Sequence, residues 1–528
     1  MHFLLVILGV FTFFVSLPAV VQVLNSVPSY FSTPVTWLPH YIPRENFNEW
    51  LEAENSIALR NLLDNFLDDG VILASPSQSA PNYYYQWIRD SAIVINTLVK
   101  QLAVCQEPDC SVIHRRIVQY LNNSWRLQRI DNLSGRGVPT STKGLGEPKF
   151  NVDFSSFDLS WGRPQNDGPA LRVVTILNYL QNLNNSDTQF SPSLLSLNDY
   201  EDYTSQFLPL KESRDIYHEI LYWDLLFIVN NWHMKNFDLW EEVYGFHFFT
   251  TVMQLYSIDR AIPVLETNKY FWGVDEQFLN KLINTRDTLL SFVREKGGFI
   301  DHTREIIKSC PQVLGERSGL DIATILASVY THDEGNAGND LEIFDVDDNN
   351  ILNTLYDLIE SMSELYPINK LKVENNNKKT KFYGTALGRY PEDVYDGIDV
   401  SEGNPWFLAT AAASELSFKL IKKYRDESKD IVILKGNRFW SLVLDQYDPR
   451  KDITITYNSH GFNETLKSLM ELGDSFLDTI RSHVANNGSM SEQFNKYTGF
   501  NQGARDLTWS YGAFLNTIQA RNSIKNLL

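Results

Sequence analysis

Apolar residues in this sequence recur at every third or fourth position, the spacing that places them on one face of an α-helix. The segments from Ile88 to Leu102 and from Val173 to Leu180 show the pattern first. It returns in three later segments, which carry Phe248, Phe249, Val252, Met253 and Tyr256; Leu279, Leu282, Leu289 and Val293; and Leu352, Leu355, Ile359, Met362 and Tyr366. Long polar loops separate the segments, and alternating patterns typical of β-strands are few. About a dozen helices without a strand-helix-strand rhythm predict an all-α domain built of helical hairpins.

The length and composition permit a large buried core. With 528 residues, of which 43% are hydrophobic, the chain can form one big domain or two ordinary ones. The formal net charge of −19 argues against nucleic acid and anionic membrane surfaces as partners, because like charges repel. A neutral polymer substrate fits such an acidic protein without an electrostatic penalty, and the flat faces of its many aromatic residues suit sugar rings.

The segment from Phe3 to Leu24 is almost entirely apolar. A length near 20 residues suits either a signal peptide or a signal-anchor. The segment lacks a Lys/Arg-rich start and a clear Ala-x-Ala cleavage site. We favour a cleaved signal peptide over a signal-anchor. In both cases residues 1–24 direct the chain into the secretory pathway, to an extracellular or vacuolar location. No other stretch is predicted to span a bilayer, so we expect membrane association only if this segment stays uncleaved. Residues 25–45 are rich in Ser and Pro and are expected to form an extended lead-in.

Three cysteines allow at most one disulfide within the chain. Cys105 and Cys110 are the closer pair in sequence, and the alternative is that these two and Cys310 are all free thiols. Five Asn-x-Ser/Thr triplets are consistent with glycosylation in the secretory pathway, and they begin at Asn122, Asn132, Asn184, Asn463 and Asn487.

Two adjacent carboxylates, Glu241 and Glu242, follow Trp240 in the stretch Phe237-Asp238-Leu239-Trp240-Glu241-Glu242. Paired glutamates on a solvated helix surface are common. The neighbouring tryptophan favours another interpretation, because a carboxyl held against an indole ring loses hydration, and its pKa rises toward the value that a general acid needs.

A second candidate carboxylate is Glu492, in the stretch Asn487-Gly488-Ser489-Met490-Ser491-Glu492-Gln493-Phe494. A single glutamate after a Gly-Ser turn is also typical of a helix cap. Together with Glu241, however, it provides the pair of carboxylates that hydrolysis of a glycosidic bond requires.

These two stretches and five others resemble the glucoamylases of glycoside hydrolase family 15, and above all the yeast type that has no starch-binding domain. The five other segments are Tyr83–Asp90, Gly144–Asn151, Trp161–Arg172, Gly388–Asp393 and Gly403–Phe407. They occur in the family's order, and the resemblance extends from about residue 45 to the C-terminus.

The resemblance implies an (α/α)6 barrel over residues 46–528, with the active-site loops at one end. It implies an exo-acting enzyme that releases β-D-glucose from the non-reducing ends of starch, glycogen or maltodextrins by inversion, with Glu241 as the general acid and Glu492 as the general base. The family positions that line the first sugar sites match Tyr83, Trp87, Arg89, Asp90, Trp161, Glu242, Arg389, Asp393 and Trp509. No cofactor and no metal are implied, and we expect a monomer whose partner is an α-glucan.

The chemistry of these residues suits those roles. Arg89, Asp90 and Arg389 can hydrogen-bond the hydroxyls of a terminal glucose. Trp87, Trp161 and Trp509 can form apolar walls that raise the pKa of the acid and exclude bulk water, and Tyr83 can help to hold the attacking water. Taken singly, each tryptophan is equally typical of an ordinary core and the Arg89–Asp90 pair of a local ion pair.

Three loops show no sign of another chemistry. The acidic stretch Asp345–Asp348 lacks the ligand spacing of a calcium-binding loop and predicts a solvated helix entry. The loop at Gly144–Gly146 lacks the Lys-Ser/Thr of a phosphate-binding loop. The run from Val373 to Lys381 is predicted to be an exposed insertion, and raw-starch adsorption through a separate binding domain is not predicted.

One position departs from the family pattern. Gly503 stands where many filamentous-fungal relatives carry a serine that hydrogen-bonds the base. Without that donor, we expect the pKa of Glu492 to be higher.

Two alternative functions remain open from the sequence. One is a glucosidase of the same fold with another linkage preference, for α-1,6-glucan or trehalose. The other is a carbohydrate-binding protein without catalysis, which retention of both Glu241 and Glu492 disfavours.

Overall fold

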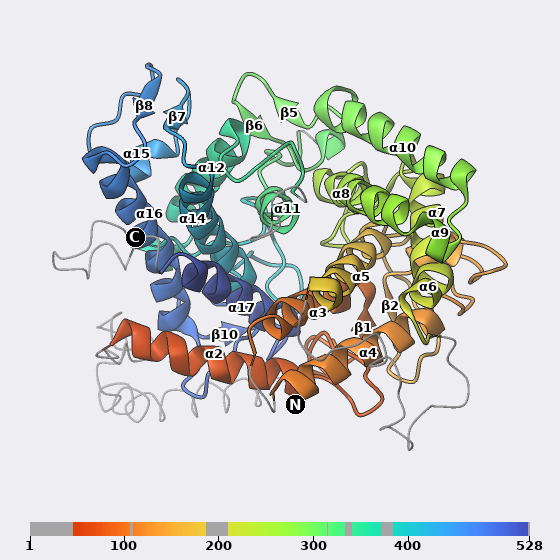
Figure 1. Ribbon diagram of the computed structural model, residues 1–528. Coiled ribbons are helices and arrows are strands. Elements are labelled where there is room, and N and C mark those ends of the chain that lie inside the picture. Colours follow the sequence, from red (N-terminus) through yellow and green to blue (C-terminus); the bar gives the residue numbers. More distant parts are fainter. Residues whose placement is uncertain are drawn as a thin grey trace, which may run out of the picture.

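The computed structural model describes residues 46–105, 109–185, 210–313, 315–332, 340–370 and 384–525, and most of them lie in helices (Figure 1). The α-helices are α2 (Phe47–Asp64), α3 (Ile88–Leu102), α4 (Asp109–Leu127), α5 (Asp167–Asn185), α6 (Ser213–Ile216), α7 (Tyr222–Asn231), α8 (Phe248–Thr267), α9 (Lys269–Trp272), α10 (Glu276–Ser291), α11 (Ala323–Thr331), α12 (Asn349–Leu365), α14 (Phe407–Glu427), α15 (Trp440–Val443), α16 (His460–His483) and α17 (Thr508–Ser523). The predictions for residues 1–45 and for Val373–Lys381 lie outside the described residues.

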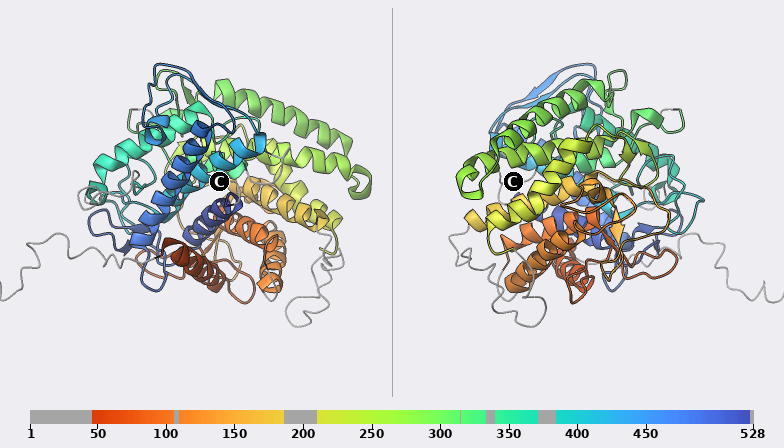
Figure 2. Two further views of the ribbon diagram at one scale, coloured as in Figure 1. Left: turned by 60° about the vertical axis from the view of Figure 1, so that its left-hand side comes forward. Right: turned by 90° about the vertical axis from the view of Figure 1, so that its right-hand side faces the viewer.

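Six helices form a closed inner ring. Around the ring, α3 contacts α5, α5 contacts α8, α8 contacts α11, α11 contacts α14, α14 contacts α17, and α17 returns to α3. Six more helices pack outside it: α4 on α3, α7 on α5, α10 on α8, α12 on α11, α16 on α14 and α2 on α17. This double ring is the (α/α)6 barrel that the family resemblance implied. Because α2 packs on α17, the first and last described helices lie side by side (Figures 1 and 2).

Burial distinguishes inner from outer helices. An inner helix has neighbours on all sides, so α17 buries its first eleven residues without a break, from Thr508 to Ile518. An outer helix has one face in solvent, and α16 buries a stripe that includes Phe462, Leu466 and Leu469, at the three- and four-residue spacing of an amphipathic helix. The five helical patterns predicted from sequence correspond to α3, α5, α8, α10 and α12 and are confirmed.

The strands of the described residues form only two-stranded antiparallel sheets. The pairs are β1 (Gln86–Trp87) with β2 (Lys149–Phe150), β3 (Asn236–Phe237) with β4 (Tyr244–Gly245), β5 (Ile300–Asp301) with β6 (Ile306–Ile307), β7 (Ile431–Ile433) with β8 (Ile453–Ile455), and β9 (Gln493–Phe494) with β10 (Asn501–Gln502). Each brings two loop segments together without adding a layer to the barrel.

The inner helices begin where loops arrive from distant parts of the chain. Backbone N–H groups at the starts of three of them donate to loop carbonyls: Ile88 of α3 to Pro148, Phe248 of α8 to Ser309, and Thr508 of α17 to Ala74, at 2.8–2.9 Å. Four outer helices, α2, α10, α12 and α16, use conventional side-chain caps instead, at Asn46, Asp275, Asp348 and Ser459. The inner helix starts therefore hold the loops of one end of the barrel in place.

Two smaller predictions are also settled. Cys105 and Cys110 form a disulfide, while Cys310 is a buried free thiol. Asp348 caps α12, as expected of a helix entry, and its neighbours Asp345 and Asp347 form ion pairs with Lys423 in place of the simple solvation that we expected.

A buried ion pair joins α5 to α7. The Arg172 guanidinium donates to both carboxylate oxygens of Asp224 at 2.8 and 2.6 Å, and both side chains are almost completely buried. Burial by itself raises the pKa of Asp224, so the carboxylate depends on its arginine partner for charge compensation.

We predict that Arg172→Met lowers the free energy of unfolding by about 3–5 kcal/mol, because it leaves a buried charge without a partner. The double variant Arg172→Met/Asp224→Leu should recover most of this loss, since it removes both charges. Guanidinium unfolding followed by circular dichroism measures both. A double variant as unstable as the single one would contradict this account.

Candidate active site

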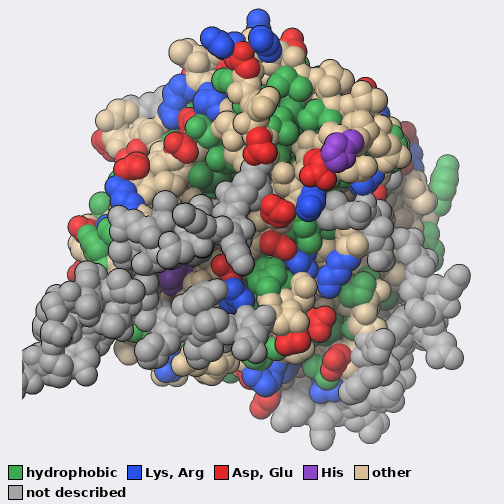
Figure 3. Space-filling model, turned by 90° about the vertical axis from the view of Figure 1, so that its left-hand side faces the viewer, with side chains coloured by type: hydrophobic (Ala, Val, Ile, Leu, Met, Phe, Trp, Pro, Cys, Tyr) green, Lys and Arg blue, Asp and Glu red, His purple; other side chains and the backbone are tan. Residues whose placement is uncertain are grey.

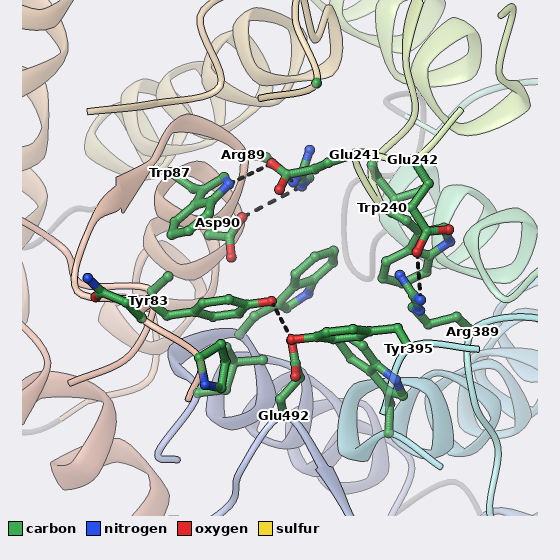
Figure 4. Close-up of a pocket in the computed structure, with 18 of the residues that line it drawn as sticks. Tyr83, Trp87, Arg89, Asp90, Trp240, Glu241, Glu242, Arg389, Tyr395 and Glu492 are labelled. Atoms are coloured by element: carbon green, nitrogen blue, oxygen red, sulfur yellow. Dashed lines mark hydrogen bonds and ion pairs between the residues drawn. The ribbon is translucent and has the colours of Figure 1, made fainter. Parts of the chain in front are cut away.

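A cavity of about 630 Å³ opens at the end of the barrel where the inner helices begin. Its lining includes Tyr83, Trp87, Arg89, Asp90, Trp161, Trp240, Glu241, Glu242, Arg389, Tyr395, Trp406, Glu492 and Trp509. Figure 4 shows Glu241 and Glu492 on different sides of it, with Glu241 near Trp87 and Glu492 near Tyr83 and Tyr395. All of the predicted site residues except Asp393 line this cavity.

The β3–β4 hairpin presents the two adjacent glutamates. Inside its loop, the Asp238 carboxylate accepts hydrogen bonds from the backbone N–H groups of Glu242 at 2.7 Å and Val243 at 2.8 Å. Glu241 itself has a φ of +68°, a left-handed conformation that is strained for a residue with a side chain. The turn is thus held in a conformation that aims Glu241 into the cavity.

The Glu241 carboxyl is surrounded by N–H donors. Trp87 Nε1 donates at 2.6 Å and Trp161 Nε1 at 2.7 Å, one to each oxygen. Gln165 Nε2 adds a bond at 3.0 Å, and an Arg89 nitrogen lies 3.4 Å away. We expected the tryptophans to surround the acid as apolar walls; instead, Trp87 and Trp161 contact it through their polar N–H groups.

Arg89 and Asp90 lie in the first turn of α3 and line the cavity. The Arg89 guanidinium donates to Gln165 at 2.7 Å and to Asp167 at 3.0 Å. Burial raises the pKa of Asp90 to about 6, although the adjacent Arg89 charge opposes the shift. These side chains form a polar wall that joins Asp90 to the Glu241 site.

Glu242 lies in a strongly cationic setting. It accepts from Arg389 and from Arg317 at 2.8 Å each, and from the hydroxyl of Tyr390. Burial alone favours the neutral acid, but the charge of Arg389, the Tyr390 hydroxyl and Arg317 together hold the pKa of Glu242 below its ordinary value. Asp393 stands outside the cavity lining and fixes Arg389 from behind, with bonds of 2.8 and 2.6 Å.

Glu492 is the most buried carboxylate of the cavity, and its pKa is shifted in the opposite direction. Its side chain precedes the β9–β10 hairpin and is 1% exposed. Burial raises the pKa of Glu492 to about 8, although the Tyr83 and Tyr395 hydroxyls and the Arg389 charge favour the carboxylate. Its Oε2 has no hydrogen-bond partner among the described residues.

Gly503 directly adjoins this carboxylate, as predicted. A β-carbon at position 503 would lie 2.5 Å from Glu492 Oε2, and the φ of +74° strongly favours glycine. With no side chain there, no hydroxyl of residue 503 can donate to Oε2. This agrees with the expected direction of the Glu492 pKa.

The remaining tryptophan, Trp509, lies away from Glu241. Its ring stacks on Trp240 with centroids 6.3 Å apart, and its Nε1 donates to the Tyr330 hydroxyl at 3.0 Å. Trp240, which directly precedes Glu241 in the sequence, donates the N–H of its Nε1 to Asp321. Trp240 and Trp509 form a stacked aromatic surface of the cavity and leave the contacts with Glu241 to Trp87 and Trp161.

Sequence reasoning missed several residues of the site. Gln165 and Asp167 lie inside the Trp161–Arg172 motif, and Tyr390 inside Gly388–Asp393, so their positions within motifs were a usable signal. Tyr395 and Arg317 lie outside every quoted motif. Only the folded chain brings them to Glu492 and Glu242.

The arrangement suits acid–base chemistry on a neutral substrate. Two carboxyl groups on different sides of one cavity have different surroundings, which is the usual way in which an acid and a base are distinguished. Among the described residues, no group of three or more His, Cys, Asp or Glu side chains is arranged to hold a metal ion.

Comparison with known proteins identifies relatives along almost the whole chain. The profile of the family described as "Glycosyl hydrolases family 15" matches residues 55–519. The chain is 38% identical over 497 residues to the Saccharomyces cerevisiae protein named "Glucoamylase, intracellular sporulation-specific", covering 90% of this chain and 84% of that one. It is 37% identical over 506 residues to a glucoamylase of Saccharomycopsis fibuligera, covering 92% of each.

Solved structures agree with the sequence matches. The glucoamylase structure from Saccharomycopsis fibuligera superposes with a TM-score of 0.81 at 37% identity, over 92% of this chain and 97% of that one. A family 15 glucoamylase from Hypocrea jecorina gives a TM-score of 0.75 at 28% identity, over 91% of this chain and 73% of that one. The family predicted from the motifs is therefore confirmed.

The raised pKa of Glu492 predicts a stability change with a defined pH dependence. Between the ordinary glutamate value of 4.5 and about 8, the native state holds a proton that the unfolded state has lost, so this group lowers stability as the pH rises. Glu492→Gln should therefore be more stable than the wild type by about 1–4 kcal/mol at pH 8 and nearly equal to it near pH 4.

Thermal and guanidinium unfolding between pH 4 and pH 8 measure this difference. Glu242→Gln is the matched control: the pKa of Glu242 is lowered, so this variant should lose stability at neutral pH. If Glu492→Gln were destabilised at pH 8, the account of its buried carboxylate would be wrong.

Proposed function

This chain belongs to family 15 of the glycosyl hydrolases, and we propose that it is an exo-acting glucoamylase that releases β-D-glucose from the non-reducing ends of starch, glycogen or maltodextrins. The observation that carries this proposal is the placement of Glu241 and Glu492 in a single cavity, at the end of the barrel where the inner helices begin. A chain that retains both carboxylates and their supporting residues has the groups required for hydrolysis.

In the proposed reaction, Glu241 is the general acid. It gives its proton to the glycosidic oxygen as the bond from that oxygen to the anomeric carbon breaks. The N–H donors of Trp87 and Trp161 keep the carboxyl in one orientation and stabilise the carboxylate that remains after proton transfer. Arg89, 3.4 Å away, adds a positive charge on the same side.

Glu492 is the proposed general base. Because burial raises the pKa of Glu492 to about 8, the ionised form that acts as base is the minor one at lower pH. In that form, a water between the carboxylate and the anomeric carbon attacks from the face opposite Glu241 and gives a proton to Glu492. The unpartnered Oε2 is an acceptor suited to that water, and the hydroxyls of Tyr83 and Tyr395 can orient it. A single displacement of this kind inverts the anomeric centre, which turns an α-linkage into β-glucose.

Charged side chains support recognition of a chain end. Asp90 and Arg89 on one side, and Arg389 on another, offer charge-assisted hydrogen bonds to sugar hydroxyls. Asp393 and Glu242 fix the Arg389 guanidinium at 2.6–2.8 Å, so the arginine is oriented before the substrate arrives. Fixed donors of this kind suit the hydroxyls of a terminal glucose, which an internal residue would not present in the same way.

Of the alternatives, a carbohydrate-binding protein without catalysis is disfavoured by the intact carboxylate pair. A preference for α-1,6-glucan or trehalose has no specific support, because the yeast relatives described above are named as glucoamylases.

The cellular location remains part of the proposal. We keep secretion, with glycosylation at some of the Asn-x-Ser/Thr sites, because of the apolar segment Phe3–Leu24; Asn463 and Asn487 are exposed on the surface. Among the helices of the described residues, none has the length and apolar character needed to cross a membrane. The name of the Saccharomyces cerevisiae relative describes that protein as intracellular.

A monomer acting on a neutral glucan remains our expectation. On the coloured part of the face drawn in Figure 3, acidic and basic side chains are interspersed, so this part of the surface does not offer nucleic acid a purely positive patch.

We predict that maltoheptaose yields glucose as the first small product and that this glucose is the β-anomer. Chain-end binding accounts for the first result and single displacement for the second. Proton NMR in the first minutes, before mutarotation, measures the anomer, and chromatography follows the oligosaccharides. Initial α-glucose would contradict the base role of Glu492, and an early ladder of shorter products would contradict exo-action.

We predict different behaviour for Glu241→Gln and Glu492→Gln when the leaving group is changed. Glu241→Gln should lower kcat on maltose by about 10²–10⁴-fold and leave KM nearly unchanged, because only proton donation is lost. With α-glucosyl fluoride, whose leaving group needs no proton, Glu241→Gln should regain much of its activity and Glu492→Gln should not. Equal recovery of both variants would contradict the assignment of acid and base.

A further inference from the structure

A buried lysine lies directly behind the two indoles that hold Glu241. Lys149 is 1% exposed and belongs to β2, where it pairs with Trp87 of β1 across the small sheet. It is not among the residues that line the cavity, so it does not face a bound sugar. Its effect on the reaction must pass through the residues around it.

Four aromatic rings surround the Lys149 ammonium, and we call them the aromatic cage. The distances from Nζ to the ring centroids are 4.7 Å for Tyr85, 4.3 Å for Trp87, 4.1 Å for Phe157 and 3.2 Å for Trp161. The rings also meet one another at steep angles, with interplanar angles of 66–87° and centroid distances of 5.2–6.2 Å. Every ring of the cage is thus held by the cation and by two other rings.

The charge of Lys149 is supported from several sides. Burial lowers its pKa to about 8, while the carboxylates of Glu241 and Glu147 favour the ammonium and Arg163 opposes it. Arg163 is itself paired with Glu147 at 2.9 Å. Lys149 therefore carries its charge below pH 8, and the cage binds a cation under those conditions.

Two of the four rings connect this cation to the catalytic cavity. An indole carries negative charge on its faces and positive charge at its edge, above all at the N–H. Trp87 and Trp161 lie within 4.3 and 3.2 Å of the ammonium by their centroids, and each donates its N–H to a different oxygen of Glu241. The cation and the carboxyl thus attract complementary parts of the same two rings.

We propose that Lys149 is a positioning residue, whose ammonium fixes the Trp87 and Trp161 rings in the orientation that directs both N–H donors at Glu241. The inference rests on the proposed role of Glu241 as general acid. Loss of the ammonium should let the two rings turn and so loosen the acid, while the sugar-binding side chains Asp90 and Arg389 stay in place.

The test compares Lys149→Met with the wild type on maltose and on α-glucosyl fluoride. Methionine keeps the length of the side chain and removes its charge. On maltose we expect kcat to fall about 10–100-fold with KM within about 3-fold, part of the factor that general acid catalysis supplies. On α-glucosyl fluoride, which needs no acid, kcat should fall less than about 3-fold. An equal loss on both substrates, or no loss on either, would overturn the proposal.

A second variant keeps the test decisive if Lys149→Met does not fold. Phe157→Leu removes one ring of the cage that contacts neither Glu241 nor the cavity, and it should reproduce the loss on maltose alone in weaker form. A loss in Phe157→Leu that does not depend on the leaving group would also count against the proposal. Arg126→Met is the matched control, because it removes a cation that lies 4.0 Å from the Phe154 ring, outside the cage, and it should leave both rates unchanged.

The Glu241→Gln variant separates this inference from the proposed function. If Glu241→Gln itself showed no dependence on the leaving group, the acid assignment would fail, and the positioning role with it. If Glu241→Gln showed that dependence and Lys149→Met did not, only the role of Lys149 would be wrong.

Discussion

Closure of the inner helical ring is the constraint on which the rest of the structure depends. Each of the six inner helices contacts the next one in the ring and also an outer helix. The cavity that holds Glu241 and Glu492 is built from the loops that lead into these helices and from the first residues of the helices. The cavity opens at the helix N-termini, where the helix dipole favours negative charge. Two carboxylates, Asp90 in α3 and Asp167 in α5, stand in the first turns of inner helices at this end.

A feature of the fold could be predicted from the sequence where it depends on residues that are neighbours along the chain. The apolar periodicity of α3, α5, α8, α10 and α12 is local, and it identifies helices because burial on a helix repeats every three to four residues. The starts of inner helices are different. Trp87, Trp406 and Leu507 stand at the N-caps of α3, α14 and α17 without a capping hydrogen bond from their side chains. The backbone N–H groups of Ile88 and Thr508 instead donate to carbonyls of distant loops. Sequence rules for helix caps consider only residues close to the helix start, so they cannot identify such partners.

The same distinction applies to the site. The two catalytic candidates and most of the lining could be predicted from motifs, because those residues lie in short stretches typical of the family. The motifs could not show which partner each of these side chains contacts. Trp240 precedes Glu241 in sequence yet bonds Asp321, whereas Trp87 and Trp161, 154 and 80 residues away along the chain, bond the Glu241 carboxyl. A residue such as Tyr395 enters the site only through the folding of its loop against Glu492, which no local pattern records.

The geometry of Glu241 is determined by several segments at once, and that agreement explains how a strained residue persists. Its backbone has a φ of +68°, and its carbonyl approaches Gly162 so closely that a β-carbon there would lie 2.7 Å away. Its carboxyl is held by indoles from β1 and from the loop at Trp161, and both indoles contact the Lys149 ammonium. A single segment would relax and release the strain. Because the β1–β2 pair, the Trp161 loop and the β3–β4 hairpin each fix part of the arrangement, relaxation of one is opposed by the other two. The packing free energy of the barrel offsets the strain in the Glu241 backbone. It also offsets the cost of burying Glu492.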